Sequence, residues 1–161
     1  MGDVFAWLQG STLGMAMRES GAWTYPVVNL LHILAIATLF GSLLVLDLRL
    51  LGAWRQVPLA SLARPIEPLA AAGCVVALLT GTALLATNAT DYVGNGFLYV
   101  KLPVVAVGVA NAVVLRRTAA WREKGLRPLS ARETRRLAAM GGVSLLAWLT
   151  AVTAGRMIAY W

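Results

Sequence analysis

The sequence contains very little charge and few of the residue types that build soluble active sites. Of its 161 residues, one is histidine, one is cysteine and 13% are charged, whereas 59% are hydrophobic. Its mean hydropathy of +0.72 is too high for an ordinary soluble domain. Either nearly every residue is buried in the core of a soluble protein, or the chain is a membrane protein surrounded by lipid.

Motifs for catalysis and metal binding are also missing. The sequence has no CxxC, no pair of histidines at metal-ligand spacing and no glycine-rich phosphate loop. The lone Cys74 makes no intramolecular disulfide and is typical of a small buried hydrophobe. The carboxylates Asp47 and Glu67 flank apolar runs rather than forming a pair inside one. We therefore expect no catalytic residue, and the sequence does not favour an enzyme.

Four long apolar runs identify lipid as the solvent. A bilayer core about 30 Å thick requires roughly 20 helical residues at about 1.5 Å each, and each run has about that length. A soluble all-helical protein would instead need polar outer faces, which these runs lack. The sequence predicts an all-α integral membrane four-helix bundle, a single domain over residues 1–161. The predicted transmembrane helices cover about 26–48, 68–87, 97–116 and 136–157.

The basic residues indicate the orientation. Three arginines lie between the first two runs and eight basic residues lie between the last two, which is eleven of the fourteen. By the positive-inside rule, both loops face the cytoplasm, whereas both termini and the loop 88–96 face outward from a bacterial inner membrane. The basic loops also attract anionic lipid headgroups without specificity. Each loop carries a single tryptophan and no repeated aromatic or glycine-rich pattern of the kind that RNA or single-strand binders use, so no nucleic-acid partner is expected.

The first twenty residues match neither a signal peptide nor a spanning helix. They lack a basic start and a long apolar stretch, although apolar residues recur within 3–19. We expect a short interfacial helix there, with its apolar side in lipid. Gly10 and Gly14 weaken helix formation, so a loosely ordered tail is the alternative. The apolar residues are Val4, Phe5, Trp7, Leu8, Leu13, Met15 and Met17.

Local patterns predict how the helices end and meet. Ser130 and Glu133 form a capping-box pattern at the start of the fourth helix. Trp54 and Trp121 are expected to mark the inner membrane boundary, and other aromatic residues the outer one. Small residues at four-residue spacing let helices approach closely and favour a compact bundle. These stripes are Gly73, Ala77 and Gly81; Ala147, Ala151 and Gly155; and Ala37 with Gly41.

A small set of polar residues lies within the predicted helices or at their outer ends. His32 lies about 9 Å inward from the outer boundary at helical rise, and Asn29 is one turn outward on its face. Lys101, Arg156 and Met157 belong to the same side. Ionisable residues inside a membrane are costly and are candidates for a functional site. The alternatives are a structural hydrogen bond for His32, snorkelling for Lys101 and interfacial anchoring for Arg156.

Two helices carry a resemblance to known families. The stretch LLHILAIATLFGSLLVLDLRLLG, with Leu31-His32-Ile33, Gly41 and Arg49-Leu50, is similar to the first helix of several small bacterial four-helix membrane families. These include HemJ-type protoporphyrinogen oxidases, CopD-like copper-resistance proteins and uncharacterised relatives, among which the nearest match is expected. The stretch FLYVKLPVVAVGVANAVVLRR resembles the HemJ third helix, in which a lysine matches Lys101.

HemJ-type proteins bind haem b through the first-helix histidine, so the resemblance implies His32 as a ligand of haem iron. The implied function is electron transfer or haem-related redox, with Lys101 and Arg156 neutralising the haem propionates and Asn29 near His32. The further histidines of that family are missing here, which argues against protoporphyrinogen oxidation. The second axial ligand would be Met157 or another methionine, a second His32 across a dimer, or none.

Two other functions stay open. A non-catalytic membrane anchor or scaffold subunit of a larger complex suits the size and the short loops, with His32 bonded to a carbonyl. Copper handling would use His32 with Met15, Met17 and Met157 as soft ligands, although no MxxM or HxxM cluster supports it. We expect a homo-oligomer or an association with other membrane subunits, because small-residue stripes offer packing surfaces.

Overall fold

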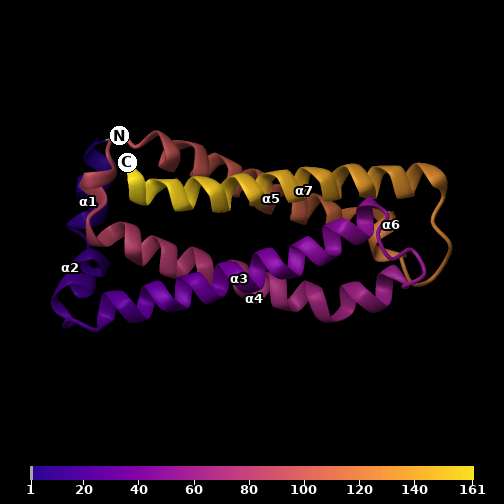
Figure 1. Cartoon of the computed structure of the whole chain (residues 1–161), viewed down its shortest axis with the longest axis horizontal. Coiled ribbons are helices and arrows are strands. Elements are labelled where there is room, and N and C mark those ends of the chain that lie inside the picture. Colours follow the sequence, from indigo (N-terminus) through magenta and orange to yellow (C-terminus); the bar gives the residue numbers. More distant parts are fainter. Residues whose placement is uncertain (1) are drawn as a thin grey trace. The chain divides into compact units, whose positions relative to one another are not determined.

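A computed structural model describes residues 2–161, and Figure 1 follows them from the indigo N-terminal helices to the yellow C-terminal one. Every regular element in that range is helical. The long helices are α3 (Thr24–Leu51), α4 (Leu59–Thr87), α5 (Gly96–Arg117) and α7 (Ala131–Met157). The short elements are α1 (Gly2–Gln9), α2 (Thr12–Glu19), η1 (Ala89–Tyr92), α6 (Ala119–Arg122) and η2 (Ile158–Tyr160).

The four long helices are each long and apolar enough to cross a membrane, with η2 continuing α7. The predicted all-α fold of a membrane protein is therefore confirmed. Each helix extends beyond its apolar run, and α4 begins at Leu59 rather than near residue 68. Pro65 and Pro68 lie inside α4, where each removes one backbone hydrogen bond without ending the helix. A run of apolar residues shows only the part of a helix that is long enough to cross the lipid. The polar turns at the helix ends carry no such signal, so they were not predicted.

Contacts divide the protein into two compact units, and α3 and α4 contribute to both. The first unit comprises the chain up to Leu39 together with Ala71–Gly96. The second unit comprises Phe40–Ala70 together with Phe97–Trp161. The first unit therefore contains α1, α2 and η1, whereas the second contains α5, α6, α7 and η2.

In the first unit, α3 and α4 run antiparallel and approach closely at Gly73. A Cβ added to Gly73 would lie 2.8 Å from the Leu39 nitrogen and 2.9 Å from the Ala35 carbonyl oxygen. These distances are shorter than any ordinary carbon contact, so the crossing requires a glycine. The first small-residue stripe therefore packs helix against helix, as predicted.

The N-terminal segment forms two helices rather than the single one expected, with a break at Gly10 and Ser11. The Ser11 hydroxyl accepts a hydrogen bond from the Gly14 amide and caps α2. Side chains of this segment also reach the far end of α4 and η1, beside which α1 and α2 run in Figure 1. Arg18 donates to the Thr87 carbonyl at 3.0 Å, and the Gln9 side-chain oxygen accepts from the Thr90 amide and hydroxyl, each at 2.8 Å.

Two apolar residues of this segment correct the expectation that its whole apolar side lies in lipid. Phe5 and Met17 are buried within the protein, because the segment packs on other helices. Val4, Trp7, Leu13 and Met15 stay exposed and form the part of the apolar side that remains available to lipid.

The core of the second unit lies at the end of the long helices that carries most basic residues. Glu67 on α4 accepts from Arg116 at 3.1 Å and lies 3.3 Å from Lys124. Trp121 is only 3% exposed and lies under the Lys124 ammonium, so the prediction that it marks a membrane boundary is wrong. Trp54 is exposed. The core cluster comprises Leu46, Leu50, Leu59, Ala63, Leu115, Ala120, Trp121 and Leu137.

The start of α7 has the predicted capping box, because Ser130 and Glu133 satisfy each other's backbone amides. Farther along α7, the stripe residues Ala147 and Ala151 are buried, as a packing surface requires. The third stripe is different. Gly41 is exposed, and a Cβ added to it would meet no atom within 4 Å, so this glycine packs against no helix among residues 2–161.

Candidate functional site

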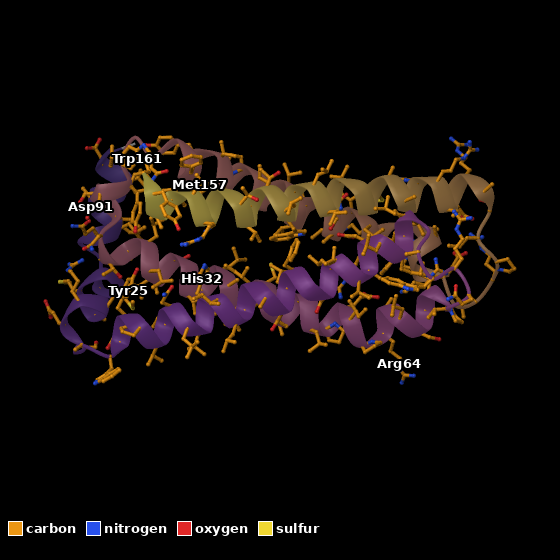
Figure 2. All side chains as sticks on the ribbon, viewed as in Figure 1. Tyr25, His32, Arg64, Asp91, Met157 and Trp161 are labelled. Atoms are coloured by element: carbon orange, nitrogen blue, oxygen red, sulfur yellow. The ribbon has the colours of Figure 1, made fainter. Side chains whose placement is uncertain are left out.

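The only histidine of the chain makes a hydrogen bond across the first unit. His32, labelled in Figure 2, is half-buried on α3, and its Nδ1 lies 2.9 Å from the Thr80 hydroxyl oxygen on α4. The Thr80 hydroxyl oxygen also lies 2.6 Å from the Val76 carbonyl oxygen. A hydroxyl has a single hydrogen, so a Thr80 that donates to Val76 accepts from His32 Nδ1, whereas a Thr80 that donates to Nδ1 leaves the ring proton on Nε2. In the first arrangement the lone pair of the neutral ring resides on Nε2.

A glycine lets the imidazole lie against the backbone of α4. A Cβ added to Gly81 would lie 2.9 Å from His32 Cε1 and 3.5 Å from Nδ1. Any side chain at this position would push the ring away from Thr80. Thr80 and Gly81 thus fix the place of the ring, which is how a neighbouring residue orients a histidine ligand in metalloproteins.

Asn29 lies three residues before His32 on α3 and is also half-buried, so the two share a helix face as predicted. Thr80, by contrast, is a site residue that was not predicted. It lies 48 residues from His32 and is one of several threonines that bond back to their own helix. The signal that marks it is its place beside Gly81 in a small-residue stripe.

The other three predicted site residues belong to the second unit. Lys101 on α5 is half-buried, and its Nζ lies 3.1 Å from the position of a Cβ added to Gly155. Gly155 immediately precedes Arg156, so Lys101 lies along the last turn of α7. Arg156 stacks over the Tyr160 ring, with 4.7 Å from Cζ to the ring centroid, and donates to the Tyr160 hydroxyl. Met157, labelled in Figure 2, is exposed.

Asp47 is a buried carboxylate that was not predicted. It is only 2% exposed because α3 continues to Leu51, so the expectation that Asp47 merely flanks the apolar run is wrong. Its side chain pairs with the buried Ser144 hydroxyl on α7, whereas its Oδ2 meets no hydrogen-bond partner among residues 2–161. The helices are close here, since a Cβ added to Gly141 would lie 2.9 Å from Leu50 Cβ. An uncompensated buried acceptor is energetically costly.

The described part of the chain contains no group of three or more histidine, cysteine, aspartate or glutamate side chains that could hold a metal ion. A metal held entirely by such residues is therefore not supported within residues 2–161. A haem differs, because its macrocycle supplies four nitrogens and asks the protein for one or two axial ligands.

Comparisons with known proteins agree with the expectation of an uncharacterised family. No curated protein and no solved structure shows a significant similarity to the chain. A family model described as "Family of unknown function (DUF6644)" matches residues 4–161. The protein, over nearly its whole length, belongs to this family of unknown function.

Proposed function

We propose that this protein is a multi-pass protein of the bacterial inner membrane that binds haem b through His32, for electron transfer or haem-related redox. The observation that carries the proposal is the hydrogen bond between His32 and Thr80. With Thr80 as the acceptor of this bond, the proton is on Nδ1 and the lone pair on Nε2, the form in which a neutral imidazole ligates a metal. The distant resemblance of the first helix to HemJ-type proteins supports the same ligand.

The residues around His32 fit the role of a single axial ligand. Thr80 would hold the Nδ1 proton and raise the basicity of Nε2, and Gly81 would leave room for the ring. When bound, haem b iron supplies one-electron chemistry between its ferric and ferrous states. The apolar residues that flank His32 on α3, Leu31 and Ile33, are exposed and suit the apolar macrocycle as well as lipid.

The test is an absorption spectrum of the protein purified after expression with a haem precursor, oxidised and then reduced with dithionite. We expect a Soret band that His32→Ala abolishes. Thr80→Val should shift or weaken the band, because the ring loses the acceptor that orients it. Thr82→Val is the matched control, since Thr82 makes the same bond to its own helix at 2.8 Å and should leave the spectrum unchanged.

A colourless wild-type protein would overturn the haem proposal. The better account would then be a non-catalytic anchor or scaffold subunit, in which the bond from His32 to Thr80 has a structural role. Metal analysis of the same sample checks the remaining alternative, since copper handling requires copper to copurify and to be lost in Met15→Leu/Met17→Leu.

A further inference from the structure

The second unit contains a pocket of about 350 Å³ where α3 ends and α7 begins. Its polar wall is made of three arginines and a threonine, and its apolar wall of leucine and alanine side chains. No carboxylate lines it. The residues used below are Arg49, Arg55 and Arg135, with Leu51 and Ala138.

Three carboxylates of this unit pair with other basic residues, and the fourth, Asp47, is buried in the protein. Glu67 pairs with Arg116 and Lys124, and Arg127 pairs with both Glu123 and Glu133. These hydrogen bonds raise the pKa of Arg127 above its ordinary value.

Among residues 2–161, no ion pair joins a carboxylate to any of the three pocket arginines. Arg49, Arg55 and Arg135 therefore concentrate positive charge without a protein counter-ion. Clustered guanidinium groups with fork-shaped donors are the preferred protein partners of phosphate.

The turn after α3 fixes the positions of Arg49 and Arg55. Gly52 has a φ of +116°, a conformation that favours glycine. The Arg55 guanidinium lies directly over it, with Nη2 2.8 Å from the position of a Cβ added to Gly52. Arg49 ties the turn together by donating to the Val57 carbonyl at 2.9 Å and to the Arg55 carbonyl at 3.4 Å. The pocket is thus a defined local structure rather than a loose basic loop.

The apolar neighbours of the pocket place it at a membrane boundary. Leu51 is the last residue of a membrane-crossing helix and is 46% exposed, and Trp54 in the same turn is 47% exposed. A tryptophan of this kind prefers the headgroup level of the bilayer. A ligand for this pocket therefore has an acidic part that meets the arginines and an apolar part that lies along Leu51 and Ala138.

We propose that this pocket binds one anionic phospholipid, with its phosphate against Arg55 and Arg135 and an acyl chain along Leu51. Basic pockets between membrane helices bind anionic lipid headgroups in this way. Free phosphate shares the acidic chemistry but lacks the chain, so it would gain nothing from the apolar wall. The site is independent of His32.

The experiment is native mass spectrometry of the full-length protein in mild detergent, with added phosphatidylglycerol, phosphatidylcholine or inorganic phosphate. We expect one phosphatidylglycerol to be retained in preference to phosphatidylcholine. Arg55→Gln/Arg135→Gln should reduce that retention by about tenfold or more, since each arginine near the headgroup contributes about 1 kcal/mol. The Arg135→Lys variant should still retain part of the bound phosphatidylglycerol.

The matched control removes the same charge outside the pocket. Arg64, which projects outward from α4 in Figure 2, and Arg117 are exposed, so Arg64→Gln/Arg117→Gln should leave the one retained lipid in place. Equal loss in both double variants would overturn the proposal in favour of general electrostatic attraction. Retention of no lipid by the wild type would overturn it, and so would displacement of the lipid by inorganic phosphate at equal concentration. Circular dichroism of each variant checks that the helices persist.

Discussion

The crossing of α3 and α4 at Gly73 provides a quantitative test of the packing in the first unit. Gly73→Ala would place a Cβ 2.8 Å from the Leu39 nitrogen and 2.9 Å from the Ala35 carbonyl oxygen. Both are backbone atoms, so neither can rotate away and the helices must separate. Overpacking of this kind costs about 1–3 kcal/mol.

Alanine also forms helix better than glycine, by about 1 kcal/mol, which partly offsets that cost. Gly41→Ala provides the matched control, because a Cβ at Gly41 meets no atom within 4 Å. The control shares the helix-propensity gain but not the clash. The free energy of unfolding of Gly73→Ala should therefore lie about 1–3 kcal/mol below that of Gly41→Ala.

The assay is unfolding of both variants in mild detergent by titration with a denaturing detergent, followed by circular dichroism. His32 and Thr80 meet two turns from Leu39 and Gly73 along the same antiparallel pair, so separation of the helices should also weaken the His32–Thr80 bond. Unfolding free energies that agree within about 0.5 kcal/mol would refute the close crossing, since that is the ordinary effect of a surface substitution.

Three further predictions concern topology, the buried carboxylate and assembly. Reporter fusions after Val57 and Gly125 should report the cytoplasm and fusions at Tyr92 and the C-terminus the outside; a consistent reversal would contradict the positive-inside assignment. Asp47→Leu should leave the free energy of unfolding in detergent unchanged or raise it, by up to about 1–4 kcal/mol, because it removes an incompletely paired buried carboxylate; a clear loss would contradict the view that this carboxylate is costly. Gly41→Leu should lower the oligomeric mass measured by light scattering while the fold persists, because Gly41 packs against no helix among residues 2–161; an unchanged oligomer would exclude this face.

The membrane-crossing helices were predictable because their signal is local. A run of about 20 apolar residues has few alternatives to a spanning helix. The capping box was predictable for the same reason, since Ser130 and Glu133 are three residues apart and need no other element.

The side chains that meet across helices were harder to predict. In an apolar helix every face is apolar, so periodicity does not show which face turns inward. Trp121 and Asp47 lie outside the apolar runs and were assigned to a boundary from that position alone, although both are buried in the second unit. Thr80 was missed because its contact with His32 depends on the register of α3 against α4, which only the packing at Gly73 fixes.

The most direct test of the proposed function is chemical rescue of His32. Substitution by glycine leaves a space of imidazole size beside Thr80 and Gly81, and free imidazole can enter it. We predict that His32→Gly purifies without a Soret band, and that haem added with imidazole restores the band in this variant, whereas haem added alone does not. A wild-type spectrum that persists unchanged in His32→Gly, or a wild-type protein that stays colourless with added haem, would contradict ligation by His32.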